Sequence, residues 1–128
     1  MDRAQSVSES ELKIMRVLWA HGEPMMLSAL MEALAAQGKL WKTNTVLTFL
    51  SRLAEKGMLR IDKVGRLNQY TVLMDEAAYM ASLTRDFLSE VYGGDAKGLI
   101  ASLLRTERLT KRDIDELQSY WEEARSNG

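Results

Sequence analysis

The residues best suited to chemistry in this sequence are cations gathered in one stretch, residues 39–66. Seven Lys and Arg side chains stand there against two acidic ones, a formal charge of +5 within a chain whose net charge is −1. A basic segment on an otherwise acidic protein is typical of a surface that binds a polyanion. On charge alone, a solvated basic face explains the pattern equally well. The seven cations are Lys39, Lys42, Arg52, Lys56, Arg60, Lys63 and Arg66.

Residues that support catalysis or metal binding are scarce. The sequence has no Cys, which excludes disulfides and thiolate metal sites, and its single His, His21, cannot build a zinc centre or a catalytic triad. It contains no Gly-rich phosphate-binding loop, and Glu122 and Glu123 fit a solvated helix face. We therefore expect a protein that is not an enzyme, with no metal and no cofactor.

Length and composition fit a soluble cytoplasmic protein. The 128 residues are 46% hydrophobic and 27% charged, which suits one compact domain with an appendage. No uncharged apolar run approaches the roughly 18 residues that a membrane helix needs, so no membrane insertion is expected. Residues 1–11 contain acids and no apolar core, unlike a signal peptide.

Three helices are predicted in the first 57 residues. Ser8 and Glu11 have the spacing of a capping box, and Val7 and Leu12 have that of a hydrophobic staple. In the third helix, Val46, Phe49, Leu50 and Leu53 share the face expected to turn inward. We expect the helices to begin after Ser8, near Ser28 and after Thr43, and to end at Gly22, Gly38 and Gly57.

Two β-prone runs follow, Met58–Val64 and Leu67–Leu73, joined through Gly65 and Arg66. Apolar and polar residues alternate along both runs, which predicts a hairpin with one covered face. Three helices followed by a hairpin is the order of a winged helix-turn-helix. The expected fold is therefore mainly α with a small β-hairpin wing, and residues 1–74 are predicted to form the winged-helix domain.

Beyond residue 74 the pattern is helical, and the segment is acidic, with a formal charge of −4. Thr110 and Asp113 repeat the capping-box spacing at the start of the last helix. The apolar stripes are too large for three helices to cover, so residues 75–128 are predicted to form a helical dimerisation domain. A monomeric helical cap is the alternative. The expected interface residues are Met80, Leu83, Phe87, Val91, Leu99, Leu103, Leu104, Ile114, Leu117 and Trp121.

Four segments resemble a known family, the penicillinase/methicillinase repressors, which also include copper-responsive repressors. They are SESELKIMRVLWAHG, WKTNTVLTFLSRLAEKGML, GRLNQYTVL and FLSEVYGG, and the resemblance runs from about Ser8 to Trp121. Its most specific part is T-x-x-x-x-L-x-R-L-x-x-K-G-x-L, from Thr45 to Leu59. The resemblance implies a transcriptional repressor that binds an inverted-repeat operator as a homodimer. A winged-helix module that binds protein instead of DNA is the alternative function.

The resemblance also implies which residues contact double-stranded DNA. It assigns base-edge contacts to Asn44, Thr45 and Thr48 and a backbone contact to Arg52, and the helical spacing independently puts Asn44 and Thr48 on the outward face. Lys63 and Arg66 are expected at the wing tip, beside the backbone or minor groove. The expected DNA-contacting residues are Lys42, Thr43, Asn44, Thr45, Leu47, Thr48, Arg52, Lys63 and Arg66.

The sequence departs from the family at three positions of this helix. Thr43 replaces a frequent Pro, and Asn44 and Leu47 replace basic residues, so weaker attraction to phosphate is expected and the resemblance does not fix the operator sequence. Leu47 is predicted to be exposed, against a thymine methyl group or simply as a surface leucine.

The resemblance offers two ways to relieve repression. The copper-responsive route uses a cysteine-rich motif, which this sequence lacks. The antibiotic-responsive route is proteolysis, implied here near Ser102 and Leu103, with an upstream membrane sensor protease as partner. That the same apolar segment is only dimer core is the alternative.

Overall fold

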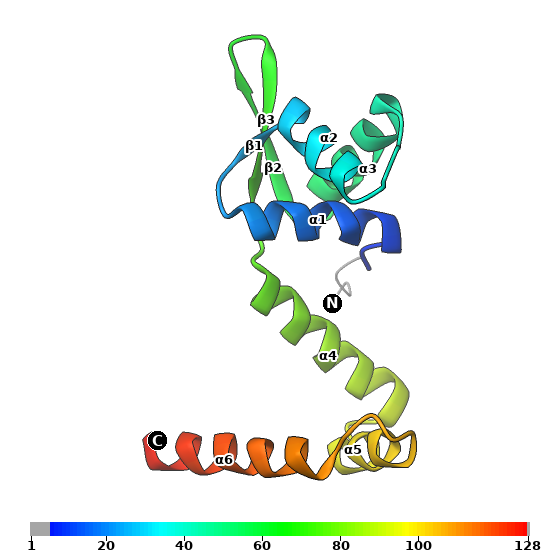
Figure 1. The fold of residues 1–128 in the computed structure, drawn as a ribbon, viewed down its shortest axis with the longest axis vertical. Coiled ribbons are helices and arrows are strands. Elements are labelled where there is room, and N and C mark those ends of the chain that lie inside the picture. Colours follow the sequence, from blue (N-terminus) through cyan, green and yellow to red (C-terminus); the bar gives the residue numbers. More distant parts are fainter. Residues whose placement is uncertain (1–5, 128) are drawn as a thin grey trace. The chain divides into compact units, whose positions relative to one another are not determined.

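The structure, a computed structural model, describes residues 6–127 (Figure 1). The chain divides into two compact units, Met1–Ser82 and Leu83–Gly128. Within the described residues the elements follow the order α1 (Glu9–His21), β1 (Met25–Met26), α2 (Leu27–Ala36), α3 (Thr43–Glu55), β2 (Leu59–Val64), β3 (Leu67–Val72), α4 (Glu76–Tyr92), α5 (Ala96–Arg105) and α6 (Lys111–Asn127).

Local signals set the limits of α1 as the sequence predicts. The Ser8 hydroxyl accepts a hydrogen bond from the Glu11 amide at 3.1 Å, and the Glu11 carboxylate accepts one from the Ser8 amide at 2.9 Å. This reciprocal capping box satisfies two backbone donors that the first turn leaves without partners. Gly22 ends the helix in a left-handed conformation with φ of 80°, which glycine adopts without strain.

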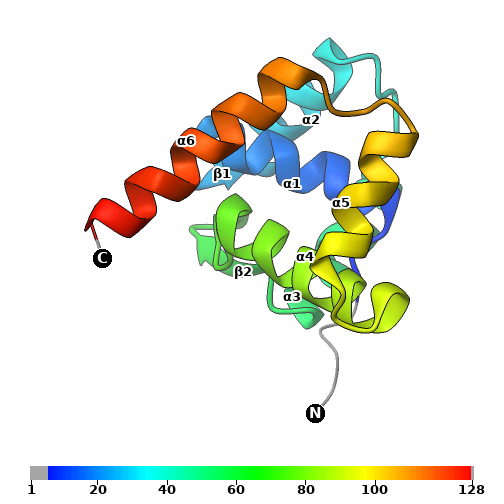
Figure 2. The ribbon, with the colours of Figure 1, turned by 90° about the horizontal axis from the view of Figure 1, so that it is seen from below.

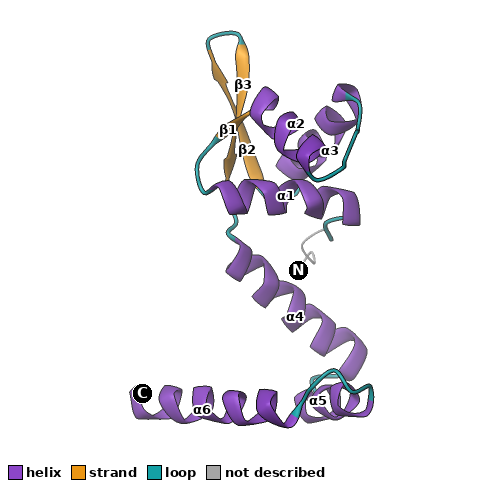
Figure 3. Cartoon of the chain, in the orientation of Figure 1, coloured by secondary structure: helices purple, strands orange, loops and turns teal. Residues whose placement is uncertain are grey.

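The helices of the first unit enclose one hydrophobic core. Each of α1, α2 and α3 turns an apolar stripe inward, and the sheet covers the remaining side of the core. Figure 3 shows these helices in purple and the strands in orange. Mostly helical secondary structure with a small wing confirms the predicted fold class. The buried core side chains are Ile14, Met15, Val17, Leu18, Met25, Leu30, Leu34, Val46, Leu50, Leu53, Met58, Leu59, Tyr70 and Tyr79.

The wing is a three-stranded antiparallel sheet in the order β1-β3-β2, where the sequence predicts only a hairpin. The hairpin register pairs Leu59 with Val72 and Ile61 with Tyr70. On the other side of β3, Met25 and Met26 of β1 pair with Tyr70 and Gln69. The sequence pattern missed β1 because two residues are too few to show alternation. Tertiary packing forms this strand, since Met25 is buried in the core.

The first unit extends beyond residue 74 to include the start of α4. The Trp19 indole Nε1 donates a hydrogen bond to the Met74 carbonyl oxygen at 2.9 Å, and its ring lies 5.9 Å from that of Tyr79. Tyr79 is buried and Met80 packs partly against the same core. These contacts explain why the compact unit ends at Ser82.

The second unit consists of the end of α4 and the helices α5 and α6. Figure 2 shows α5 in yellow and α6 in orange to red, joined by a short connection. The predicted capping box of the last helix is confirmed, because Thr110 and Asp113 exchange hydrogen bonds of 3.0 and 3.1 Å. None of its described side chains, from residue 83 to residue 126, is buried. This unit therefore has apolar surface without a core of its own.

No helix in the described part of the chain combines the length and apolarity needed to cross a membrane. Residues 6–127 also contain no group of three or more His, Cys, Asp and Glu side chains arranged to hold a metal ion.

Candidate nucleic-acid interface

Helix α3 has one buried and one exposed face. Val46, Leu50 and Leu53 are fully buried, as the sequence predicts, whereas Phe49 is only half-buried and packs edge-on against Trp41, with ring centroids 5.4 Å apart. The opposite face is polar and open to solvent, and it carries Asn44, Thr45, Thr48, Ser51 and Arg52. The core therefore holds α3 firmly by one side and leaves its polar side available to a ligand.

The start of α3 presents backbone donors. Lys42 precedes the helix and makes no side-chain capping bond, and the first intrahelical bond runs from the Val46 amide to the Lys42 carbonyl oxygen at 3.1 Å. The amides of Thr43, Asn44 and Thr45 therefore lack acceptors within residues 6–127. Free amides at a helix N-terminus carry partial positive charge and suit a phosphate oxygen. The exposed Lys42 side chain adds a full charge there.

Thr48 uses its hydroxyl within the helix. Its Oγ1 donates to the Asn44 carbonyl oxygen one turn earlier, at 3.0 Å. In this rotamer the hydroxyl offers only its lone pairs to a partner, and the methyl group remains as a second contact. Thr48 is therefore suited to accept a hydrogen bond or to touch a thymine methyl group.

Two of the seven cations counted in the sequence are neutralised by neighbours. Lys56 Nζ lies 2.6 Å from Glu11 Oε1 and donates to the Ser6 carbonyl oxygen at 2.9 Å. Arg60 Nε lies 2.8 Å from Asp62 Oδ2. Of the other five, Lys39 is half-buried, and within residues 6–127 the four exposed ones have no ion-pair partner; they are Lys42, Arg52, Lys63 and Arg66.

The Glu11–Lys56 pair joins the start of α1 to the end of α3, and its glutamate is buried. Glu11 is 1% exposed. Burial alone raises the pKa of its carboxyl group, but hydrogen bonds from Lys56 and the Ser8 amide, together with the Lys56 charge, outweigh it and lower the pKa below its ordinary value. The pair therefore stays ionised and anchors the C-terminal end of α3.

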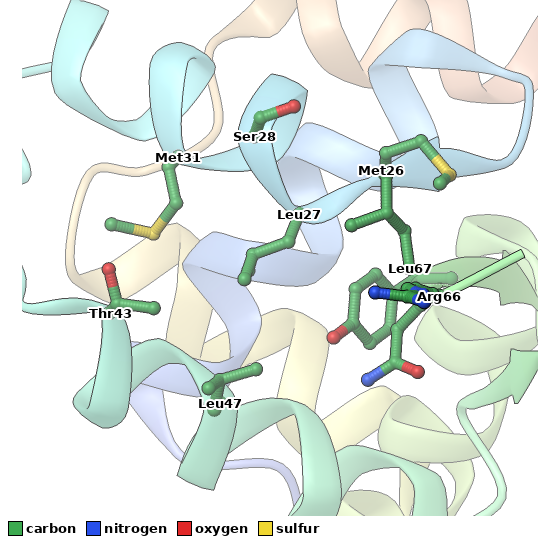
Figure 4. A pocket seen from close by; sticks show the side chains of 10 residues that line it. Met26, Leu27, Ser28, Met31, Thr43, Leu47, Arg66 and Leu67 are labelled. Carbon is green, nitrogen blue, oxygen red and sulfur yellow. The ribbon is translucent and has the colours of Figure 1, made fainter. Parts of the chain in front are cut away.

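The wing tip and the start of α3 line one pocket. A pocket of about 420 Å³ separates them, and residues of α2, of α3 and of the β2–β3 hairpin line it, among them Thr43, Leu47, Arg66 and Asn68. Figure 4 shows Thr43 and Leu47 on α3 near Leu27 and Met31 of α2. Arg66 lies in the turn between β2 and β3, and Lys63 pairs in register with Asn68. The structure thus brings α3 and the wing onto one surface.

The prediction that Leu47 is exposed is wrong, because Leu47 is half-buried and lines this pocket. Asn68 and Tyr70 line it too, and sequence reasoning did not select either as a site residue. Tyr70 is recognisable in the sequence only as a residue of the covered strand face. The pocket itself depends on how three distant segments meet.

The residues expected at a dimer interface fall into two groups. Met80 is half-buried against the core of the first unit, and Leu99 is half-buried in the second. The others are 37–62% exposed within the single chain: Leu83, Phe87, Val91, Leu103, Leu104, Ile114, Leu117 and Trp121.

The expected cleavage position lies inside a helix. Ser102 and Leu103 belong to α5, and the Ser102 hydroxyl accepts a hydrogen bond from the Tyr92 hydroxyl at 2.9 Å. Any protease acting at this bond must first unwind part of α5, because a helical segment does not fit an extended substrate cleft.

Comparisons with known proteins identify the family of this chain. A family model described as "Penicillinase repressor" matches residues 7–123. The penicillinase repressor of Bacillus licheniformis is 30% identical over 123 residues, covering 96% of this chain and 94% of that protein. The methicillin resistance regulatory protein MecI of Staphylococcus aureus (strain N315) is 25% identical and covers 92% of this chain and 94% of its own.

A solved structure resembles the first unit. The solution structure of the DNA-binding domain of the repressor BlaI is 33% identical, with a TM-score of 0.53, and the match covers 62% of this chain and 94% of that one. The family consists of repressors and not of enzymes, in agreement with the sequence-based expectation. The chain belongs to the penicillinase repressor family and is a winged-helix, DNA-binding transcriptional repressor.

Proposed function

We propose that this repressor binds an inverted-repeat operator as a homodimer, with one α3 in the major groove of each half-site. One observation carries the proposal. The exposed polar face of α3, three free backbone amides and four unpaired cations of the described residues lie on α3 and the neighbouring wing. Donors and cations in that arrangement match a sugar-phosphate backbone flanking a groove. Bound DNA is then closed to transcription by steric occlusion.

Individual roles follow from position. Asn44, Thr45 and Thr48 are proposed to contact base edges, because they are exposed on the first two turns of α3. Lys42 and Arg52 flank them and are proposed to contact phosphates, Lys42 together with the free amides. At the wing, Lys63 and Arg66 are proposed to reach the backbone or minor groove.

Thr43 and Leu47 are proposed to border the DNA where α3 meets the pocket. Half-burial limits Leu47 to an edge contact, such as one with a thymine methyl group.

Self-association is supported by the second unit. None of its described side chains is buried, and even the large apolar residues Val91 and Trp121 are each 62% exposed. Large apolar side chains left exposed in this number are typical of protein–protein interfaces. A twofold dimer would present two α3 helices about 34–36 Å apart or a multiple of that distance, as a palindromic site requires.

Relief of repression is proposed to follow cleavage between Ser102 and Leu103 by an upstream membrane sensor protease, acting in the cytoplasm where the DNA lies. The bond lies in α5 among exposed apolar residues, so cutting it would separate α6 from the rest of the second unit. Mass spectrometry of the chain from derepressed cells should show a fragment that ends at Ser102. Full-length chain in those cells would contradict this step.

DNA titration of the full chain tests the proposal against the alternative of a winged helix that binds only protein. Fluorescence anisotropy should show binding that weakens steeply with salt, by a slope of about −0.9 in log K per phosphate contacted. Arg52→Ala should weaken binding to all duplexes about equally and reduce the slope by about one unit per arginine. Arg85→Ala, an exposed arginine of the second unit, is the matched control. Absence of duplex binding in dilute buffer would refute the proposal.

A further inference from the structure

The pocket between α2, α3 and the hairpin, called the wing pocket here, has the character of a small-molecule site. Its volume of about 420 Å³ is within the range of ligand pockets. Its walls are mainly apolar, with Leu27 and Met31 from α2, Leu47 from α3 and Leu67 from β3 (Figure 4). A groove that met only a phosphate backbone would have no use for these walls, because burying a phosphodiester against them costs desolvation.

The hydroxyl of Tyr70, a buried residue, supplies an independent observation. Tyr70 is 1% exposed and lines the wing pocket, and its hydroxyl has no hydrogen-bond partner among the described residues. Among those residues no fully enclosed side-chain oxygen lacks a partner, so the Tyr70 hydroxyl keeps contact with solvent at the pocket wall. A buried tyrosine usually pairs its hydroxyl. A ligand entering the wing pocket would provide the acceptor.

The charge of the wing pocket selects an anion. Arg66 lines it from the hairpin, and Thr43 lines it from the start of α3, where no described side chain caps the backbone amides. A guanidinium group pairs bidentately with a planar carboxylate, and a helix N-terminus adds partial positive charge. Among the residues that the structure describes, no acidic side chain lines the wing pocket to compete for them.

We propose that the wing pocket binds a small organic carboxylate with a compact apolar body, and that the bound carboxylate competes with DNA. The carboxylate accepts hydrogen bonds from Tyr70 and Arg66, and the apolar body lies against Leu27, Met31 and Leu47. Competition with DNA rests on the proposed function, because Thr43, Leu47 and Arg66 belong to both surfaces. Binding of the carboxylate to the free protein does not depend on the proposed function.

Three probes on the full-length chain without DNA test the site: hexanoate, hexan-1-ol and acetate. In amide NMR spectra, hexanoate should give saturable shifts around Leu47, Leu67 and Tyr70. Hexan-1-ol lacks the charge and should bind at least about tenfold more weakly, since hydrogen bonds to charged groups are the stronger ones. Acetate lacks the apolar body and should not saturate. Shifts that fail to saturate with hexanoate would overturn the proposal.

Tyr70→Phe removes the hydroxyl and keeps the ring, and it should weaken hexanoate binding about tenfold. The matched control is Tyr79→Phe, a buried tyrosine outside the wing pocket, which should bind hexanoate like the unmodified chain. Equal hexanoate affinity in the two variants would overturn the assignment. So would loss of DNA affinity in Tyr70→Phe without any hexanoate binding, because the hydroxyl would then serve the DNA backbone.

Anisotropy with labelled duplex tests competition separately. At constant ionic strength, with acetate as the balancing salt, hexanoate should raise the apparent Kd for DNA in proportion to its occupancy of the pocket. In Tyr70→Phe this response should shift to about tenfold higher hexanoate concentration. Hexanoate binding with no change in DNA affinity would refute competition alone. A chain that binds hexanoate but no duplex would refute the proposed function and leave the pocket assignment standing.

Discussion

The two units of this chain treat their apolar residues in opposite ways. The first closes α1, α2, α3 and the sheet around a core in which Ile14, Leu30 and Leu50 are fully buried. The second leaves Phe87, Leu117 and Trp121 between 45 and 62% exposed in the single chain. Burial of apolar surface is the main favourable term in folding. The first unit therefore has a core that can keep it folded, whereas the proposed dimer would cover the apolar residues of the second.

This contrast separates stability from assembly. A side chain in the first unit should affect unfolding at any protein concentration. A side chain on the second unit's surface should affect self-association, and so its effect on stability should depend on concentration.

The largest expected effect comes from the core. Leu50→Ala should reduce the free energy of unfolding by about 2–5 kcal/mol, because it leaves a cavity where the side chain is fully buried. Leu117→Ala is the matched change on the second unit, where the side chain is 49% exposed. Urea unfolding at two protein concentrations should show a concentration-independent loss for Leu50→Ala alone. The same concentration-independent loss in both variants would remove the distinction between the units.

The second largest expected effect comes from placing a charge on the proposed dimer interface. Trp121→Asp should weaken self-association by about 2–4 kcal/mol, since a buried tryptophan is often a dominant contact of an interface. Sedimentation equilibrium measures the change, and the first unit's amide spectrum should remain native. Glu123→Gln, on the opposite face of α6, serves as control. An unchanged dimer in Trp121→Asp would exclude this surface.

The Glu11–Lys56 ion pair should make the stability of the first unit depend on pH. The folded pKa of Glu11 lies below its ordinary value of 4.5, so the carboxylate binds fewer protons in the folded state. Its stabilisation is complete above that ordinary value and is lost as the pH falls through the lower folded pKa. Glu11→Gln should lower the free energy of unfolding by about 1.5–3 kcal/mol at neutral pH. It should also reduce the loss of that free energy as the pH falls, called the acid limb below.

Urea unfolding between about pH 3 and pH 7 follows this change. Glu9→Gln, an exposed glutamate of the same helix, should keep the acid limb. An unaltered acid limb in Glu11→Gln would mean that another carboxylate governs it.

The smallest expected effect distinguishes the two contacts open to Thr48. Because the hydroxyl already donates to Asn44, we expect the methyl group to carry the base contact. Thr48→Ser should then cost about 1 kcal/mol at one base pair, and Thr48→Val much less. Competition titrations with duplexes altered at single positions would show this. A larger loss in Thr48→Val than in Thr48→Ser assigns the contact to the hydroxyl instead.

Local signals made much of the fold predictable. The capping box of Ser8 and Glu11, the glycines that end helices and the apolar periodicity of α3 all act within a few residues, and the structure follows them. The features that sequence reasoning missed depend on distant partners. The strand β1 exists only against β3, Lys56 is neutralised by Glu11 from another helix, and Leu47 is covered where α2 and the hairpin meet α3.

The candidate site was predictable to a similar extent. The exposed face of α3 follows from its buried one, so Asn44 and Thr48 could be placed from periodicity. The internal hydrogen bond of Thr48, and the lack of a partner for the Tyr70 hydroxyl among residues 6–127, could not be predicted, because they depend on a rotamer and on packing.

Selection of bound fragments from random duplex DNA by the full-length chain tests most directly whether α3 binds DNA as part of a dimer. We predict enrichment of an inverted repeat whose half-site centres lie about 10–10.5 base pairs, or a multiple of that spacing, apart. Recovery of single, unrepeated half-sites, or of no common sequence at all, would contradict it.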